Sequence, residues 1–312
     1  MQVKKIDTTA ATSTKVDYRP MSFRDFVWQH EITRVVQTAI ASSKKSERVL
    51  GHMLLLGPAW YGKTTLAQII AYDMGTHCKV VTAYALSKPA DVISMLNSLS
   101  HGDVLFIDEI HRLPPKLEEM LYTAMEDYRI DMVMPDGGHV SIPLQPFTLI
   151  GATTKSDHLS KPLKSRFVYK FHFADYTDTE KQKILWYYLT KLWVSYEPLD
   201  VVIFARLLET IPRELYNGCV RLYDYLNAHH TQLVISPTII ESFAVWNNTH
   251  EWWLNSLHRA YLELFDHTTK PMSLNTIAVK LWLDEQTVEE EIEPLLVKLG
   301  YIDRTPKGRV KI

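Results

Sequence analysis

The stretch LLLGPAWYGKTTLAQII, residues 54–70, decides the fold of this chain. A short apolar run ends at Leu56, and residues 57–64 match the pattern G-x-x-x-x-G-K-[ST] directly before a helical pattern. In such a context the backbone N–H groups of the loop and the N-terminus of the following helix surround phosphate groups. A phosphate-binding loop between a strand and a helix is therefore predicted, and with it an α/β domain.

Four residues of this loop are expected to contact the nucleotide. Lys63 reaches the β- and γ-phosphate oxygens of ATP, and the Thr64 hydroxyl binds Mg²⁺. Gly62 and Thr65 stand on either side of these two residues and are included among the nucleotide contacts. A glycine-rich turn without a ligand is the alternative, and the placement between a strand and a helix argues against it.

Two aromatic residues, Trp60 and Tyr61, occupy positions that the loop pattern leaves free, so their side chains can point away from the phosphates. A tryptophan at position 60 has to adopt an ordinary φ or bear strain of about 1–3 kcal/mol. Trp60 is included among the nucleotide contacts, as part of an altered outer wall of the site.

The segments around the loop alternate between apolar strands and amphipathic helices. Between residues 18 and 176, apolar runs such as VLFIDEI and FTLIGATT are separated by helical patterns, which is typical of a parallel sheet covered on both faces. The segment 131–144 carries Asp136-Gly137-Gly138 between two partly alternating runs. This segment predicts a hairpin that projects from the sheet.

The pattern changes after residue 176. Residues 177–247 are predicted to form an all-helical lid domain, because apolar positions there recur at helical spacing. Residues 248–312 predict three helices followed by a short hairpin that turns at Pro306-Lys307-Gly308, which indicates a winged-helix domain. Residues 1–17 are polar and predict a flexible arm.

The overall composition limits the class of protein. The chain has 34 Lys and Arg against 36 Asp and Glu, so any contact with nucleic acid must come from a local basic patch. Its two cysteines lack the spacing of a zinc site or a disulfide framework, which favours a reducing cytoplasm. No apolar run has the length of a membrane span, so a cytoplasmic protein without membrane contact is expected.

Two acids, Asp108 and Glu109, follow the buried strand that begins at Val104. Beside a phosphate loop, Asp108 is expected to hold the metal ion and Glu109 to polarise the water that attacks ATP. Acids at a strand end can also cap a following helix, and this is the competing interpretation.

The order of these motifs, together with IDEIHRL, MEDY, LIGATT, KPLKSRF, IPREL and RTPKGRV, resembles the RuvB family. Members of this family are AAA+ ring ATPases that drive branch migration of Holliday junctions, and the likeness spans roughly residues 16–312. The resemblance implies a homohexameric ring that uses ATP and Mg²⁺, double-stranded DNA at Holliday junctions as substrate, and a RuvA-type junction-binding partner. It also implies a role in recombination and DNA repair.

The same resemblance assigns three residues to the hydrolysis of ATP. Thr154, at the end of LIGATT, senses the γ-phosphate, and Arg213 in IPREL is a second sensor. Arg166 in PLKSRF is the arginine finger that reaches the nucleotide of a neighbouring subunit, a role that suits a permanently charged guanidinium. Lys164 stands where the family has an earlier arginine of this segment. A pair of solvated cations is the alternative.

Further residues surround the nucleotide by resemblance. The adenine is framed by Tyr18, Arg19 and Tyr176, while Glu126, Asp127 and Tyr128 approach the nucleotide across the subunit interface. Tyr176 could instead be a core residue at a domain junction, and the acidic helix end could simply be solvated. The family usually has glycine where this chain has Trp60 and Trp28.

The last nine residues, 304–312, contain four cations and no acid. By resemblance, Arg304 and Arg309 contact DNA, most simply at its phosphates. A short basic tail can also be merely solvated. The projecting hairpin resembles the element that engages RuvA, and its apolar contact would consist of Met132, Val133, Met134 and Ile142, unless these pack on the sheet.

Two classes of function fit these features. The first is a hexameric DNA motor that hydrolyses ATP at subunit interfaces. The second is a clamp-loader-like or degenerate ring subunit that binds nucleotide and DNA without translocation. Glu109 and Arg166 favour the motor, because a subunit that does not hydrolyse ATP has no need of either residue.

Overall fold

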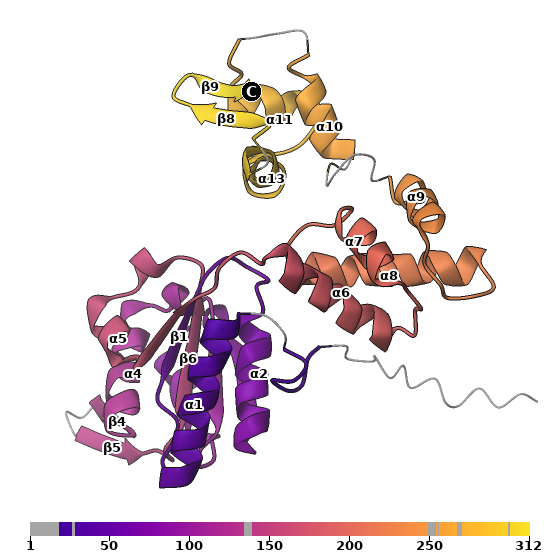
Figure 1. Ribbon diagram of the computed structural model, residues 1–312. Coiled ribbons are helices and arrows are strands. Elements are labelled where there is room, and N and C mark those ends of the chain that lie inside the picture. Colours follow the sequence, from indigo (N-terminus) through magenta and orange to yellow (C-terminus); the bar gives the residue numbers. More distant parts are fainter. Residues whose placement is uncertain are drawn as a thin grey trace, which may run out of the picture. The chain divides into compact units, whose positions relative to one another are not determined.

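The computed structural model describes residues 19–26, 29–133, 139–248, 254, 256–266, 270–298 and 300–312. Contacts within the chain divide it into two compact units, Met1–Tyr176 and Thr177–Ile312. Figure 1 shows the elements of both units along the sequence. No helix in these described ranges has the length and apolar character needed to cross a membrane.

The first unit is built on a five-stranded parallel sheet with the order β2-β3-β6-β1-β7. Its strands are β1 (Met53–Leu56), β2 (Cys78–Thr82), β3 (Val104–Asp108), β6 (Thr148–Thr153) and β7 (Tyr169–His172). In the register Leu56 lies between Thr153 and His172. The predicted parallel sheet is confirmed, and the loops that follow β1, β3 and β6 leave the same edge.

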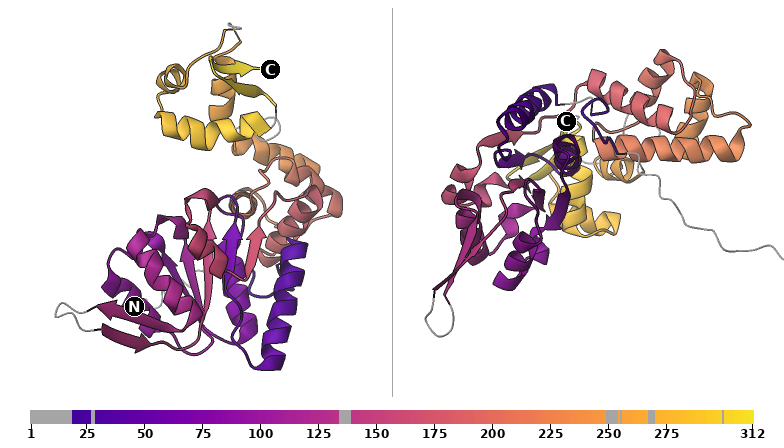
Figure 2. Two further views of the ribbon diagram at one scale, coloured as in Figure 1. Left: turned by 90° about the vertical axis from the view of Figure 1, so that its left-hand side faces the viewer. Right: turned by 90° about the horizontal axis from the view of Figure 1, so that it is seen from below.

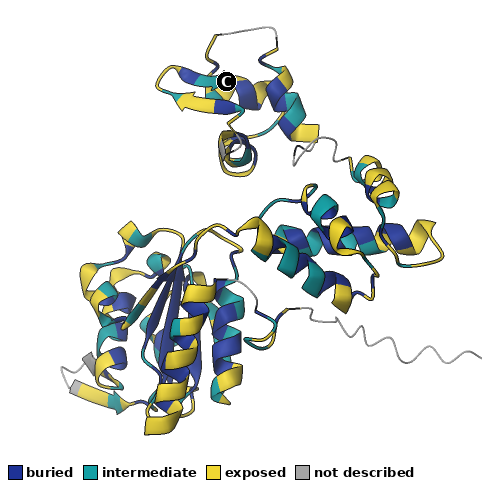
Figure 3. Cartoon of the chain, in the orientation of Figure 1, coloured by how far each residue is buried: buried dark blue, intermediate teal, exposed yellow. Residues whose placement is uncertain are grey.

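Helices cover both faces of this sheet. They are α1 (His30–Ser46), α2 (Lys63–Met74), α3 (Pro89–Asn97), α4 (Pro115–Glu126) and α5 (Lys161–Arg166), with short 3₁₀ turns η1 (Ala83–Ala85), η2 (Ile110–Arg112) and η3 (Ser156–His158). Leu54 and Leu56 pack in one core with residues of α3, α4 and α5. Met53 and Leu55 are equally buried and point to the opposite face, because side chains alternate along a strand. Figure 3 shows the buried strands between helices whose outer surfaces are exposed.

The predicted hairpin is also present. Strands β4 (Arg129–Val133) and β5 (His139–Pro143) pair antiparallel in a sheet of their own, and Figure 2 shows them extending away from the parallel sheet. Ile130 and Leu144 at the base are buried in the core of the first unit, whereas Ile142 is only half-buried. Met134 and the side chains of Met132 and Val133 lie outside the described part of the chain.

The second unit begins with four helices, α6 (Asp178–Lys191), α7 (Pro198–Ala205), α8 (Pro212–His229) and α9 (Pro237–Trp246). Three of them start with proline, whose fixed φ and missing N–H suit the first turn. The fourth begins with a capping box in which Thr177 and Glu180 satisfy each other's backbone N–H groups. This helical segment follows the predicted change of pattern.

The remainder consists of α10 (Ser256–Glu263), α11 (Leu274–Leu281), α12 (Glu285–Thr287), a π-helical turn η4 (Val288–Ile292), α13 (Glu293–Lys298), and the strands β8 (Ile302–Thr305) and β9 (Gly308–Lys311). Tyr261, Ile277, Leu296 and Ile302 belong to its own buried core. The antiparallel pair β8–β9 is the predicted wing. Gly308 is required there, because a Cβ would lie 2.5 Å from the carbonyl oxygen of Met272 and φ is +129°.

Candidate functional site

The phosphate loop, residues 57–62, connects β1 to α2 and requires both glycines of its pattern. Gly57 has a φ of +146°, and a Cβ on it would lie 2.8 Å from Cβ of Phe173. Gly62 caps the N-terminus of α2 with a φ of 90°. Both positions demand the conformational freedom of glycine. The loop is therefore held close to the backbone after β7 and opens onto the N-terminus of α2.

Lys63, the first residue of α2, is buried at the base of the loop. Its Nζ donates hydrogen bonds to the carbonyl oxygens of Gly57, at 2.8 Å, and Pro58, at 2.6 Å. Burial lowers the pKa of Lys63, while the charges of Asp108 and Glu109 act to raise it. The ammonium group thus lies near both acids, but within the described ranges its hydrogen bonds go to neutral oxygens, which phosphate oxygens can replace.

The two predicted acids lie at the end of β3 with different backbone conformations. Asp108 is the last residue of the strand, and its Oδ1 accepts a hydrogen bond from the N–H of Glu109 at 3.0 Å. Burial raises the pKa of Asp108. Glu109 has a left-handed φ of 49°. Such a conformation is strained in a residue with a Cβ, and strain of this kind clusters at functional sites.

Glu109 is held in place by Thr154, directly after the neighbouring strand β6, and by His111 in the turn η2. The hydroxyl of Thr154 donates to Glu109 Oε2 at 3.3 Å, and His111 Nδ1 lies 3.1 Å from the same oxygen. Thr153 Oγ1 lies 2.8 Å from His111 Nδ1. The structure thus brings the predicted sensor Thr154 to the predicted catalytic glutamate.

His111 was not among the residues predicted for the site. Burial lowers its pKa, as do the nearby charges of His158 and Lys155, while Glu109 acts to raise it. The His111 ring therefore lies between Glu109 and Thr153 and helps to fix the position of the Glu109 carboxylate. The signal available in the sequence was its place two residues after Glu109, in the short turn η2.

Mg²⁺ is implied by a phosphate loop, and the residues present fit it. No group of three or more His, Cys, Asp and Glu within the described ranges could enclose a metal ion. Mg²⁺ in nucleotide sites takes only one or two protein ligands and completes its shell with phosphate oxygens and water. Thr64, half-buried in the first turn of α2, and Asp108 supply hard oxygen donors of that kind.

The two aromatic residues of the loop behave differently from each other. Trp60 is 55% exposed and has a φ of 66°, so the strained alternative for this position is the one observed. Tyr61 is buried, and its hydroxyl donates to Asp175 Oδ1 at 2.6 Å. The hydroxyl of Tyr176 donates in turn to the carbonyl oxygen of Tyr61 at 2.6 Å. Tyr61 therefore fastens the loop to the segment after β7, a role that its free position in the pattern did not reveal.

The residues expected to frame the adenine are described only in part. Tyr176 is buried against the loop, and Arg19 is exposed. Tyr18 and Trp28 lie outside the described residues. Next to position 28, Gln29 donates from Nε2 to the carbonyl oxygen of Ala174 at 2.7 Å, so the N-terminal segment is joined to the same strand end as the loop.

Arg166 and Glu126, both predicted to lie at a subunit interface, are neighbours. The guanidinium of Arg166 lies over the Tyr122 ring, 4.4 Å from its centroid, and NH2 donates to Glu126 Oε2 at 3.2 Å. Its Nε is buried and has no hydrogen-bond partner among the described residues. Residues 40 positions apart in sequence thus form one surface at the ends of α4 and α5.

Asp127 and Tyr128, predicted with Glu126, point elsewhere. Asp127 pairs with Arg129 at 3.2 Å, at the base of the hairpin. Tyr128 is half-buried and its ring meets Phe147 edge to face. Arg213 is exposed in the first turn of α8, in the second unit. Among the described residues, neither Asp127 nor Tyr128 contacts the Arg166–Glu126 pair.

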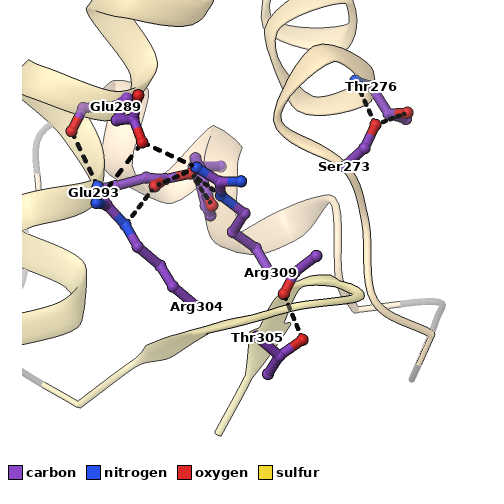
Figure 4. Close-up of polar contacts among 9 residues, drawn as sticks. Ser273, Thr276, Glu289, Glu293, Arg304, Thr305 and Arg309 are labelled. Atoms are coloured by element: carbon purple, nitrogen blue, oxygen red, sulfur yellow. Dashed lines mark hydrogen bonds and ion pairs between the residues drawn. The ribbon is translucent and has the colours of Figure 1, made fainter.

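The wing arginines share one buried acid, as Figure 4 shows. Glu293 is completely buried at the start of α13. Its two carboxylate oxygens accept from Nε of Arg304 and Nε of Arg309, both at 2.8 Å, and Tyr261 donates its hydroxyl to Oε1 at 3.0 Å. Glu289 adds a further contact to each arginine. Contact with Glu293 raises the pKa of Arg309.

Acidic residues that lie close to the basic tail in the fold therefore neutralise much of its positive charge. Arg304 and Arg309 are balanced by Glu289 and Glu293, and Lys311 pairs with Asp266 at 2.5 Å. Lys307 is exposed at the tip of the wing, and the described residues offer it no ion pair. The acids were missed because they precede the tail in a separate helical segment.

Comparisons with known proteins agree with this geometry. Residues 18–173 match the family model of the Holliday junction DNA helicase RuvB P-loop domain, and residues 251–311 match that of the RuvB C-terminal winged helix domain. The chain is 39% identical over 296 residues to a Holliday junction branch migration complex subunit RuvB of Campylobacter jejuni, covering 94% of this chain and 88% of that protein. The corresponding Helicobacter pylori subunit is 37% identical over 308 residues, with 96% and 90% covered.

Solved structures give the same answer for the fold. The Thermotoga maritima RuvB Holliday junction branch migration motor superposes with a TM-score of 0.78 at 34% identity, covering 95% of each chain. A point mutant of that protein gives a TM-score of 0.80 at 35% identity, with 94% of this chain and 96% of the mutant covered. The predicted fold class is confirmed: a P-loop AAA+ domain with a parallel sheet, a helical middle and a C-terminal winged helix.

Proposed function

The chain belongs to the RuvB family of Holliday junction DNA helicases, and from this premise we propose how its residues act. It is an ATP-dependent motor subunit for branch migration of Holliday junctions. The observation that carries this function is the meeting of Lys63, Asp108 and Glu109 at one edge of the sheet, in a chain that ends in a winged helix.

In the ATPase centre, the ammonium group of Lys63 changes its hydrogen-bond acceptors when the nucleotide binds. When ATP binds, the β- and γ-phosphate oxygens replace the carbonyls of Gly57 and Pro58 as acceptors for its ammonium group. Glu109, fixed by Thr154 and His111, orients the attacking water. Thr64 and Asp108 would hold Mg²⁺, and the ion would neutralise part of the phosphate charge.

The nucleotide is enclosed by the remaining predicted contacts. Backbone N–H groups at Gly62 and Thr65 face the phosphates, and position 60 forms the outer wall of the loop. Tyr18, Arg19 and Tyr176 frame the adenine. Arg213 at the start of α8 senses the phosphates and couples the helical lid, residues 177–247, to the nucleotide state.

The chain acts in a homohexameric ring, with Arg166 completing the site of the neighbouring subunit. The contact between Arg166 and Glu126 supports this proposal, because it places two interface residues on one surface. Asp127 and Tyr128 stand at the edge of the same interface. An arginine finger stabilises charge that develops on the transferring phosphoryl group.

DNA and partner contacts lie outside the ATPase centre. The winged helix, residues 248–312, binds double-stranded DNA through Arg304 and Arg309, which contact phosphates from fixed positions. The hairpin 131–144 binds a RuvA-type protein through Met132, Val133, Met134 and Ile142; Ile142, half-buried, is the member whose side chain is described. The motor acts in the cytoplasm, where the DNA lies.

A synthetic four-way junction tests the function directly. We expect ATP-dependent displacement of its strands, stimulated by a RuvA-type partner, and loss of displacement in Glu109→Gln although ATP still binds. Glu119→Gln, an exposed acid on α4, is the matched control and should behave as wild type. If the wild-type chain displaces nothing with or without the partner, while binding ATP and DNA, the motor function is wrong and a static ring subunit is supported.

A further inference from the structure

The tryptophans of this chain have unusual surroundings. Five of the eight lie in the described part, at positions 60, 186, 193, 246 and 282. None of these five is buried: Trp193 is 87% exposed and Trp282 is 94% exposed. Tryptophan is normally among the most buried residues on average, because its large apolar surface is costly to hydrate.

Three of these five tryptophans also have a glycine-like backbone. The φ angles of Trp60, Trp193 and Trp282 are 66°, 58° and 59°. All other described residues with a Cβ contribute only five further cases of positive φ. A left-handed conformation is a genuine outlier for a bulky residue, whereas glycine adopts it without cost.

Trp193 and Trp282 occupy the position after a helix that glycine fills elsewhere in the same chain. After α2, the N–H of Gly75 bonds the carbonyl of Tyr72 and the next N–H bonds that of Ala71, the two hydrogen bonds of a Schellman motif. Gly300 after α13 makes the same pair of bonds. So do Glu47 after α1, Trp193 after α6 and Trp282 after α11, with identical spacing. Among these residues the bulky tryptophans are the stronger outliers.

Trp60 lies in a different setting, the phosphate loop between β1 and α2. Its neighbours Gly57 and Gly62 also have positive φ, so three left-handed residues lie within six positions. Backbone N–H groups must face the phosphates there, which is why such loops use glycine. A docking surface would explain exposed aromatic side chains, but it would not require a left-handed backbone under them.

Composition points in the same direction. The chain has 11 glycines in 312 residues. Average usage of about 7% would give about twice that number. The chain is therefore poor in glycine, as expected if some positions printed as tryptophan are glycine in the protein.

We propose that positions 60, 193 and 282 are glycine in the protein that the source cell makes, because the gene has UGA codons there that the cell reads as glycine. UGA is a stop codon in the standard code and is read as tryptophan or as glycine in variant codes. Decoding of UGA as glycine instead of tryptophan therefore accounts for all three positions at once. It also removes the backbone strain and the exposed indole rings, and it restores a glycine to the phosphate loop.

The proposal is tested on protein purified from the source cells. Trypsin releases three diagnostic peptides, residues 49–63, 192–206 and 281–298, each with one of the three positions. We expect each peptide to have the mass calculated with glycine, and the gene to have UGA at each position. A tryptophan mass in any of these peptides, or a UGG codon at any of these positions, would overturn the proposal for the chain.

The physical premise has a separate test in the recombinant chain made with tryptophan. The triple variant Trp60→Gly, Trp193→Gly, Trp282→Gly should unfold at a higher urea concentration than its parent. Trp186→Gly is the matched control: position 186 is inside α6, where glycine weakens the helix, so its urea midpoint should fall. If the triple variant also unfolds at a lower urea concentration, tryptophan belongs at these positions and the inference is wrong.

Discussion

The phosphate loop and the wing hold their cations in opposite ways. Lys63 bonds two neutral carbonyl oxygens, and burial lowers its pKa. Arg309 bonds a completely buried carboxylate, Glu293, and the contact raises its pKa. Lys63 therefore lacks an anionic partner bonded to it in the described part of the chain, whereas Arg309 is already paired with a carboxylate.

This difference separates a cation that changes its bonding partners when the ligand binds from a cation that an ion pair holds in a fixed position. A buried cation with neutral partners is costly in the free protein and gains when phosphate arrives. A buried ion pair is costly to break, because its remaining member is left unpaired. Substitutions at the loop should therefore change turnover, and substitutions at Glu293 should change stability.

The largest effect is expected at Glu109. Glu109→Gln removes the group that orients and polarises the attacking water, so ATP turnover should fall by about 10²–10⁴-fold. Nucleotide affinity should change little, because Lys63 and the loop glycines are untouched. Steady-state ATPase assays and binding of a fluorescent nucleotide measure the two quantities. If nucleotide affinity falls as much as ATP turnover, Glu109 contributes to binding rather than to catalysis.

The second effect concerns the wing. Glu293→Gln leaves Arg304 and Arg309 without their shared charge, and we expect the free energy of unfolding to fall by about 3–5 kcal/mol. Glu290→Gln, an exposed neighbour, is the control and should shift it by less than about 0.5 kcal/mol. Urea unfolding of the chain without nucleotide gives both values. If Glu293→Gln leaves the free energy of unfolding unchanged, other contacts hold the wing arginines in place.

A smaller effect is expected at Lys307. It is exposed at the wing tip and has no ion pair within the described ranges, so it is available to DNA phosphates. Lys307→Ala should weaken binding to duplex DNA of any sequence and lower the slope of log affinity against log salt by about 1. Unfolding in urea should stay unchanged. If affinity and salt dependence both match the wild type, the wing tip does not meet DNA.

Much of the first unit followed from local signals in the sequence. Apolar runs at 53–56, 104–108 and 148–153 became strands, and the loop pattern located α2. Strand ends of a parallel sheet meet at one edge, so Lys63, Asp108 and Thr154 could be expected together. The hairpin was predictable from its glycines, because turn geometry is a local property.

The contacts that were missed depend on segments far apart in the sequence. Glu293 lies 16 positions before Arg309 in another element, and no charge count within the tail reveals it. His111 reaches Thr153 only because β3 pairs with β6. Tyr61 bonds Asp175 across 114 positions. Pairings of this kind require the three-dimensional arrangement, not the pattern.

The smallest effect tests the comparison at the loop itself. Burial raises the pKa of Asp108, so its ionised form is destabilised in the folded chain relative to the unfolded one. Above its folded pKa both states are ionised and the folded state bears the full cost. As the pH falls through that raised pKa the folded state takes up the proton first, and the cost disappears below the unfolded value of about 3.9.

Asp108→Asn should therefore make the nucleotide-free chain slightly more stable at pH 7, and the gain should shrink as the pH falls toward about 4. The same variant should lose ATPase activity, because the amide is a poor ligand for Mg²⁺. Urea unfolding at several pH values measures the first effect, and Asp73→Asn, an exposed acid near the end of α2, is the control. A loss of stability at pH 7 would show that Asp108, like Glu293, is held by its neighbours, and the contrast between loop and wing would fail.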